Sequence, residues 1–387
     1  MRPSVPTSQS ASAAHTPLAE ALVRHIRANG PITFADYMRE CLYHPECGYY
    51  AQAAPHAVHD RDYYTSVDVH PVFGRLLARQ LAEMWEALGR PAQFGVVEMG
   101  AGAGKLASQI LDFSRSTLPD FYQAQRYMAI ERSDARRGQQ AALLGEHLNT
   151  GRAVSHAEMP EQSIPGCVLS NEFVDALPVH RVLQQEHGLQ EVFVGVRGGE
   201  LCDAPGPPST PELAAYFERQ AIRLQAWQRG EVNLAAEEWI RGVGRLLQRG
   251  FALTIDYGHP ATELYNQRHM RGTLLAYHRH RAAEDFYARP GEQDLTAHVN
   301  FTALQQAGAG AGLETMGLVS QSHFLLALGR GNDFADLYDQ GQSEAEKLKA
   351  RLKLKTLIYP EGMGETFRVL VQKKNVEAAQ LTGLKPL

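Results

Sequence analysis

The part of the chain best suited to chemistry is an acidic residue followed by three alternate glycines. Glu98-Met99-Gly100-Ala101-Gly102-Ala103-Gly104 comes directly after the apolar run Phe94-Gly95-Val96-Val97. Because glycine has no Cβ, such a loop can turn tightly and bring its backbone close to a flat ligand that a side chain would exclude. We therefore expect Gly100, Gly102 and Gly104 to hold a nucleotide-type ligand.

Three ligands are candidates for this loop. The phosphate-binding pattern GxxxxGK[ST] fails, because Met99 and Leu106 stand where it needs glycine and Ser or Thr. The dinucleotide pattern GxGxxG fits only in a weaker form that starts at Gly102 and ends at Ala107, so an NAD-dependent oxidoreductase remains an alternative. S-adenosylmethionine fits better. Its site needs an acid at the end of the first strand, here Glu98, to face the cationic amino end of the ligand.

A second acid is placed to hold a ribose. Glu131 ends the short apolar run Arg126-Tyr127-Met128-Ala129-Ile130. It lies about 30 residues beyond the first glycine, the length of a strand-helix-strand unit, whereas NAD enzymes place a similar acid at roughly 20 residues. We expect Glu131 to accept both ribose hydroxyls. The alternative is a solvated carboxylate at a strand end.

The acceptor side is predicted at the end of another strand. Val168-Leu169-Ser170 leads into Asn171-Glu172-Phe173, at the edge where open α/β sheets bind ligands. Methyl transfer from a sulfonium mainly requires alignment of the acceptor. Asn171 offers an amide oxygen, and the Glu172 carboxylate could form a bidentate pair with a guanidinium. We predict that Glu172 orients the substrate; the alternative is that Asn171 caps a helix and Glu172 is exposed.

Other reaction classes have little support. Asp256-Tyr257-Gly258 could be a further strand-end site or a simple turn. His278, His280 and His298 have no acid or cysteine at standard ligand spacing nearby, so we predict no metal site. No GxSxG elbow surrounds the candidate serines, which argues against a hydrolase.

Composition narrows the class of protein. The 387 residues are 44% hydrophobic and 21% charged, as in an ordinary globular protein, and the formal net charge of −5 gives no basic footprint for nucleic acid. The four cysteines show no CxxC pairing, which favours a reducing compartment. No run of about 18 apolar residues predicts a membrane span. We expect a cytoplasmic bacterial protein, or a mitochondrial matrix protein if the source is eukaryotic.

The apolar periodicity predicts an α/β protein with a doubly wound, largely parallel sheet. From residue 94 to 171 strands and helices alternate: strand 94–99, helix 105–117, strand 126–131, helix 134–147, a short strand near 152–156 and strand 167–170. An antiparallel meander follows over 179–201. Helices are expected over 211–227, 234–247, 296–307 and 343–357, and a strand over 367–371.

This pattern divides the chain into four parts. We expect a disordered tail over 1–16 and an N-terminal helical region over 17–90. A methyltransferase core spans 91–260, with a helical insertion at about 204–248. Residues 261–387 then supply a substrate-side loop and complete the core.

Several motifs in order along the chain together resemble the MidA-like family, whose eukaryotic members are mitochondrial complex I assembly methyltransferases. The matching segments are Ile32-Thr33-Phe34-Ala35-Asp36-Tyr37-Met38, His44-Pro45-Glu46-Cys47-Gly48-Tyr49-Tyr50, Asp62-Tyr63-Tyr64-Thr65-Ser66, Phe73-Gly74, Glu98 through Gly104, Asn171-Glu172-Phe173-Val174-Asp175-Ala176-Leu177-Pro178, Asp256-Tyr257-Gly258 and Pro290-Gly291-Glu292-Gln293-Asp294-Leu295-Thr296-Ala297-His298-Val299. The resemblance implies a seven-stranded Rossmann-like methyltransferase sheet with inserted segments, and S-adenosylmethionine as methyl donor. It also implies protein arginine as acceptor in the mitochondrial members.

The resemblance adds residues to the predicted site. Asp294 and His298 join Asn171 and Glu172 on the acceptor side, and Ser66 joins the donor set. The resemblance implies that the partner is a protein, for example a respiratory-complex subunit, and that it is not a nucleic acid. A non-catalytic assembly chaperone on the same fold is the alternative function.

Two departures from the family pattern concern the site. Val67-Asp68 stands where the family usually has Pro-Glu, and Asn300 stands where an Asp commonly follows His-Val. Asn300 keeps the shape of that Asp without its charge, so we assign Asn300 no catalytic role.

Overall fold

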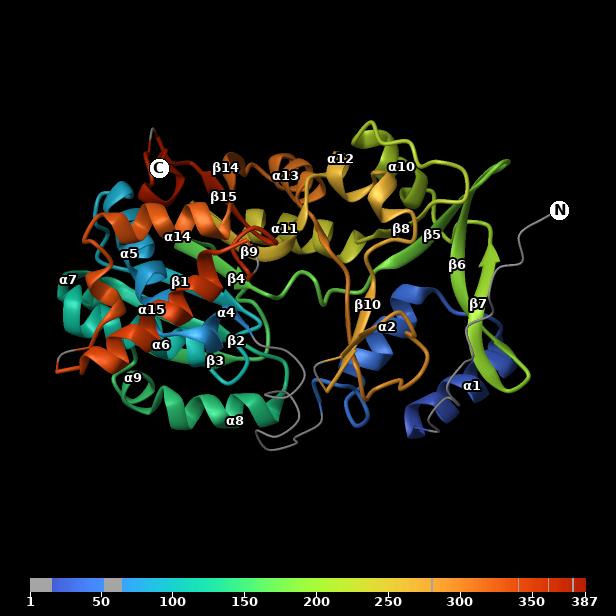
Figure 1. Cartoon of the computed structure of the whole chain (residues 1–387), viewed down its shortest axis with the longest axis horizontal. Helices are drawn as coiled ribbons and strands as arrows, with labels where there is room; N and C mark the ends of the chain where they lie inside the picture. The colour runs from blue at the N-terminus through green and yellow to red at the C-terminus, as the bar shows by residue number, and fades with distance from the viewer. Residues whose placement is uncertain (1–15, 52–64, 280, 340, 361, 378) are drawn as a thin grey trace.

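The glycine-rich segment begins at the centre of a large mixed sheet, seen at the left of Figure 1. In this computed structural model, which describes residues 16–51, 65–279, 281–339, 341–360, 362–377 and 379–387, strand β1 (Phe94–Met99) pairs in parallel with β2 (Gln125–Ile130) and β4 (Ile164–Asn171). All six residues of β1 are buried. A strand buried on both faces explains why its sequence is a continuous apolar run.

Seven strands run across this large sheet in the order β14-β15-β9-β4-β1-β2-β3, with β13 beside β9. The remaining members are β3 (Ala153–His156), β9 (Leu247–His259), β13 (Val299–Asn300), β14 (Glu314–Ser320) and β15 (Phe367–Lys374). Only β15 runs antiparallel to its neighbours β9 and β14. The predicted α/β class and seven-stranded Rossmann-like sheet are confirmed.

Helices cover both faces of the large sheet. On one face lie α4 (Ser66–Val69), α5 (Val72–Ala87), α6 (Lys105–Thr117), α7 (Pro119–Ala124), α14 (Gln321–Arg330) and α15 (Glu344–Ile358), which share one apolar core. On the other lie α11 (Leu234–Leu246) and α13 (Phe301–Gly310). Near β3 lie α8 (Asp134–Leu143) and α9 (Gly145–Asn149). No helix of the described residues is long and apolar enough to cross a membrane.

A second, smaller body, which we call the small lobe, lies at the right of Figure 1. Its sheet has the order β7-β6-β5-β8, formed by β5 (His180–Gln185), β6 (Gly188–Arg197), β7 (Glu200–Gly206) and β8 (Arg229–Val232). It also contains α1 (Pro17–Asn29), α2 (Phe34–Tyr43), α10 (Glu212–Arg219), α12 (Ala261–Leu264) and the three strands β10 (Leu275–His278), β11 (Arg281–Ala283) and β12 (Asp294–Thr296).

The N-terminal helices are divided between the two bodies. Helices α1 and α2 contact strands of the small sheet, whereas α5 packs on α6 and β4 of the large sheet. The Thr33 hydroxyl accepts the Asp36 N–H at 3.0 Å and so caps the first turn of α2. The predicted tail lies outside the described residues, apart from Thr16, which caps α1.

Two predicted helices have other limits, and two elements were not predicted. The helix expected over 211–227 ends at Arg219, and β8 follows it as the fourth strand of the small sheet. The helix expected over 296–307 starts at Phe301, because residues 294–296 pair with β10 instead. Strand β14 and helix α14 were not expected from the sequence.

A row of glycines crosses the centre of the large sheet. Gly95 of β1 is opposite Gly166 of β4, which is opposite Gly250 of β9. A Cβ on Gly166 would lie 1.9 Å from the Gly95 carbonyl oxygen, and a Cβ on Gly250 would lie 1.9 Å from the Gly166 oxygen. These strands can therefore approach each other only without side chains at these positions.

We predict that Gly166→Ala lowers the free energy of unfolding by roughly 3 kcal/mol or more, because the new methyl group meets backbone and Gly166 has φ of +154°. Urea unfolding followed by circular dichroism measures the change. Gly138→Ala is the matched control: its Cβ meets nothing within 4 Å in α8, so it should be neutral or slightly stabilising. Equal midpoints for the two variants would contradict the prediction.

Candidate active site

The glycine loop lies between the end of β1 and the start of α6. Gly100, Gly102 and Gly104 have φ of +67°, +54° and +87°, a region that other residues rarely adopt. A Cβ on Gly100 would lie 2.8 Å from the ring of Phe173, and one on Gly102 would have only Arg136 within 4 Å, at 3.8 Å. The loop backbone is thus open to a ligand at Gly102 and closely packed at Gly100.

Glu131, directly after β2, faces the same loop. Its Oε2 accepts the Gly102 N–H at 3.0 Å, and its Oε1 accepts the Ser133 N–H at 2.9 Å. A carboxylate oxygen has two lone pairs, so both oxygens keep capacity for hydroxyl donors. The structure therefore brings Glu131 to the glycine loop, next to Gly102.

Glu98 lies near the end of β1 and is buried. The Tyr127 hydroxyl donates to its Oε2 at 2.8 Å. Burial raises the pKa of Glu98 to about 8, and nearby Glu131 adds to this effect, while the Tyr127 hydrogen bond opposes it. A buried carboxyl of this kind gains from a nearby cation, which would favour its charged form.

Glu172 occupies an unusual backbone position after β4. Its φ is +51°, in the left-handed region, and its N–H donates to the Ile255 carbonyl at 3.0 Å. The Ser66 N–H and the Asn171 Nδ2 donate to its Oε1 at 2.9 and 3.2 Å. Burial raises the pKa of Glu172 to about 8. The predicted alternative of an exposed Glu172 beside a helix cap is wrong.

Asp256 fixes the turn that follows Glu172. Its Oδ2 accepts the N–H groups of Phe173, Val174 and Asp175 at 3.2, 2.9 and 3.3 Å. Asp256 lies inside β9, so the plain turn considered from the sequence is wrong. Burial raises the pKa of Asp256, and the neighbouring Asp175 and Glu172 raise it further.

Two more carboxyls, the buried Asp175 and the half-buried Asp294, extend this cluster. The Tyr257 hydroxyl donates to Asp175 at 2.6 Å, and the Tyr50 hydroxyl donates to Asp294 at 2.9 Å. Burial raises the pKa of Asp175 to about 6 and that of Asp294 to about 7, and the charge of Asp175 contributes to the shift at Asp294. Asp294, which the sequence predicted as a site residue, thus lies near the turn formed by residues 171–175, which we call the acidic turn.

Three acceptor oxygens on this turn are buried without a hydrogen-bond partner among the described residues. They are Oδ1 of Asn171, Oε2 of Glu172 and Oδ1 of Asp175. An unsatisfied buried acceptor costs about 1–3 kcal/mol. Three such oxygens within five residues form a group that a ligand rich in N–H donors would satisfy.

His298 belongs to a different cluster. Its ring lies 5.4 Å from the rings of both Tyr257 and His259, with His269 at 6.2 Å. Burial lowers the pKa of His298 to about 4, and the two other histidines lower it further. Tyr257 therefore separates this ring from Asp175. His280 lies outside the described residues, and no metal-binding group of His, Cys, Asp or Glu occurs among those described.

The other predicted positions have clear places. Ser66 contacts Glu172 through its N–H and Gln321 through its hydroxyl, on the acceptor side of the site. Asp68, a departure from the family pattern, forms a salt bridge with Lys105, which begins α6. Asn300, the second departure, caps α13 by accepting the Ala303 N–H and donates to Tyr216 and Gln220.

The sequence reasoning missed four members of the cluster. Asp175, Tyr257 and Tyr50 lie inside the family motifs without a predicted role, and the sequence allows two interpretations of Asp256. The available signal for Asp175 is its position three residues after Glu172, beyond the end of the same predicted strand.

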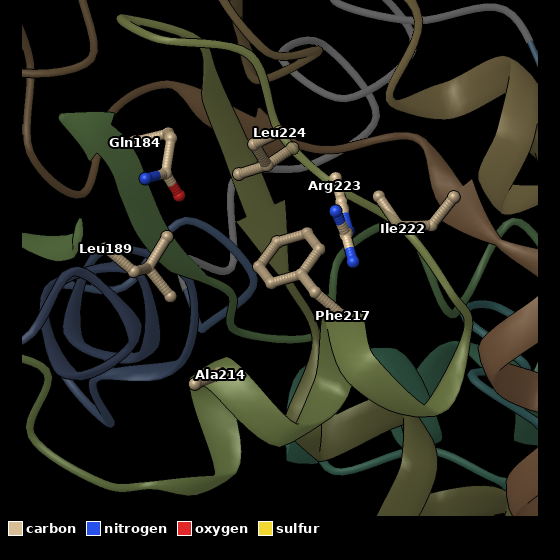
Figure 2. Close-up of a pocket in the computed structure, with 7 residues that line it drawn as sticks. All are labelled: Gln184, Leu189, Ala214, Phe217, Ile222, Arg223 and Leu224. Carbon is tan, nitrogen blue, oxygen red and sulfur yellow. The ribbon is translucent and has the colours of Figure 1, made fainter. Parts of the chain in front are cut away.

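Two hollows lie in the small lobe, away from these residues. One of about 300 Å³ is lined by Gln184, Leu189, Ala214, Phe217, Ile222, Arg223 and Leu224 (Figure 2). Another of about 330 Å³ is lined by Arg181, Asp203, Arg229, Arg271, Glu284, Asp285, Phe286 and Tyr287. Neither hollow is lined by residues of the glycine loop or of the acidic turn. The residues suited to chemistry therefore lie outside both hollows.

Known proteins resemble the chain over most of its length. Residues 76–319 match a family described as "Putative S-adenosyl-L-methionine-dependent methyltransferase". The mitochondrial protein arginine methyltransferase NDUFAF7 of Bos taurus is 28% identical over 380 residues, covering 92% of this chain and 83% of that protein. The Drosophila melanogaster homolog is 29% identical over 412 residues, covering 97% and 89%. A crystal structure from Burkholderia thailandensis, bound to S-adenosyl-homocysteine, is 33% identical with a TM-score of 0.84 and covers 95% and 94%.

These similarities decide between the donor ligands considered above. The cofactor is S-adenosylmethionine, and the NAD-dependent alternative is set aside. The resemblance seen in the sequence motifs is confirmed by the family match and by the mitochondrial relatives. The chain belongs to this family of S-adenosyl-L-methionine-dependent methyltransferases.

Proposed function

We propose that the protein transfers a methyl group to an arginine nitrogen of a partner protein. The observation that supports this most directly is the group of buried acceptor oxygens on Asn171, Glu172 and Asp175. A guanidinium carries five N–H donors in one plane and no acceptor, so it matches such a group better than a hydroxyl or thiol would. The relatives from cattle and fly are named as protein arginine methyltransferases, which agrees with this acceptor.

The donor would lie over the glycine loop. Gly102 would leave room for the adenosine, whereas Gly100 packs against Phe173 and Gly104 packs against Gln140 and Leu144, which hold the loop in place. Glu131 would accept the ribose hydroxyls, and Glu98 would face the cationic amino end. The donor carries its methyl group on a positively charged sulfur. After the methyl group is transferred, the rest of the donor leaves as a neutral thioether.

On the acceptor side, the protein must orient a guanidinium and free a lone pair on one nitrogen. Glu172 Oε2 would accept one N–H, and Asp175 and Asn171 would hold the other edge of the plane. As the new carbon–nitrogen bond forms, the nitrogen loses a proton to a carboxylate. Burial raises the pKa of Glu172 to about 8, which suits this proton acceptor. Asp294 would add negative charge beside the site.

The proposed activity is tested in the host. Proteome-wide mass spectrometry should find methylarginine peptides that disappear when the gene is deleted and return with the wild-type gene. Return with the Gly102→Val variant as well, which is expected to lose the methyl donor, would indicate a non-catalytic assembly chaperone. An unchanged set of methylarginine peptides on deletion would refute the proposed acceptor.

The donor position is tested by Gly102→Val. We expect the affinity for S-adenosylmethionine to fall by roughly 100-fold or more, or about 2.8 kcal/mol, because the branched side chain enters the ligand space. Isothermal titration calorimetry measures this. Gly151→Val is the matched control, since Gly151 also has a positive φ, +67°, but lies in a loop before β3 with open space around it. If both variants bind the donor equally well, the loop is misassigned.

The acceptor position is tested by Glu172→Gln. We expect unchanged donor affinity and a fall in kcat by roughly 100-fold to 10,000-fold, the usual contribution of a general base. The pH profile gives a second readout. Because burial raises the pKa of Glu172 to about 8, wild-type kcat/KM should rise with pH up to about that value and then level off. The residual activity of Glu172→Gln should lack this limb. Exposed Glu186→Gln is the control, and full turnover in Glu172→Gln would remove this residue from the mechanism.

A further inference from the structure

Helix α15 is apolar on two opposite sides. Ala350, Leu354 and Leu357 are buried against the core of the large sheet. Leu348 and Leu352, one turn apart on the outer side, are 56% and 55% exposed. Tyr359, directly after the helix, is 47% exposed. A helix in contact with one core needs only one apolar side, so the outer one is unexplained by the fold.

Basic side chains accompany this outer apolar side. The helix carries five basic residues and two acidic ones. Lys347 pairs with Glu344 at 2.8 Å, but Lys349, Lys353 and Lys355 form no salt bridge with a described residue. The ammonium of Lys355 lies 5.6 Å from the centre of the Tyr359 ring. The outer side of α15 is therefore both apolar and positively charged, although the whole chain has a net charge of −5.

The same helix is connected to the proposed acceptor site. Gln321 donates through Nε2 to the Leu357 carbonyl at 3.1 Å and accepts the Ser66 hydroxyl through Oε1 at 3.2 Å. The Ser66 N–H in turn donates to Glu172 at 2.9 Å. Figure 1 shows α15 beside α4, the short helix that begins at Ser66, and the two are in contact. A molecule bound on α15 would thus contact a helix that is linked to Glu172 through Gln321 and Ser66.

We propose that the outer side of α15, formed by Leu348, Leu352 and Tyr359 with Lys349 and Lys355, is a docking surface for an acidic, amphipathic segment of the protein that is methylated. This inference rests on the proposed function. Apolar side chains of the segment would cover the two leucines, and carboxylates beside them would pair with the lysines. Docking here would raise the local concentration of the target arginine near the acidic turn.

Size and position favour a protein segment over a membrane surface. The apolar ridge from Leu348 to Tyr359 is roughly 16 Å long at 1.5 Å per residue. It contains two leucines and one tyrosine, which is little apolar area for anchoring on lipid, and stable anchoring commonly takes two signals. Its position beside α4 also gives a reason for a protein substrate to bind at this place.

The test uses the full-length protein and a synthetic peptide that carries a fluorescent label. The peptide forms a helix with leucines on one face and glutamates on either side of that face. Anisotropy should show saturable binding that weakens at least roughly tenfold, or 1.4 kcal/mol, in Leu348→Ser/Leu352→Ser and in Lys349→Glu/Lys355→Glu. The controls are Leu143→Ser, an exposed leucine on α8, and Arg197→Glu/Arg223→Glu, an exposed double charge reversal in the small lobe. Both controls should bind as the wild type does.

Methyl labelling of extract from the deletion strain gives a second readout. The two α15 variants should incorporate less labelled methyl into protein than the controls, with donor affinity unchanged by calorimetry. Equal peptide binding or equal labelling by variants and controls would overturn the docking surface. Binding to phosphatidylglycerol vesicles without binding to the peptide would assign α15 to a membrane instead. Peptide binding that persists in an enzyme without arginine methylation would refute the proposed function and leave the surface intact.

Discussion

The burial of several carboxyl groups at one edge of the large sheet is the constraint on which the rest of the site depends. Glu98, Glu172, Asp175 and Asp294 are all buried enough that their pKa values are raised. Mutual repulsion adds to the cost of burial, so a cluster of this kind disfavours its own charged state. A bound cationic sulfonium ligand would instead favour the charged state of these carboxyl groups, because its positive charge attracts the carboxylates around it.

The fold limits this cost by supplying hydrogen-bond donors. Tyrosine hydroxyls reach Glu98, Asp175 and Asp294, and backbone N–H groups reach Glu172 and Asp256. The small lobe also reaches this turn directly, since the Tyr43 hydroxyl of α2 donates to the Ala176 carbonyl at 2.9 Å. The acidic turn is therefore a place where the small lobe and the segment after β4 of the large sheet are in contact.

The sequence predicted those parts of the site that local chemistry determines. The glycine loop, Glu131 and Glu172 follow directly from strand ends and from the absence of side chains, so the pattern located them. The contact of Tyr50 with Asp294 joins residues 244 positions apart, which no local pattern encodes. Strand β14 was missed for a related reason: its residues are exposed or half-buried, and it becomes a strand by pairing with β15. The role of Asp256 was hidden because its partners lie on a different segment.

The backbone of Glu172 shows how the fold maintains a position that local preference opposes. A left-handed conformation costs a residue with a Cβ about 1–2 kcal/mol, and a glycine would avoid most of that cost. Three N–H groups held by Asp256 and the bond from Glu172 to Ile255 fix the turn in spite of it. A purely structural turn would gain stability from glycine here. The presence of a carboxylate at this position is therefore better explained by what its side chain binds than by what its backbone requires.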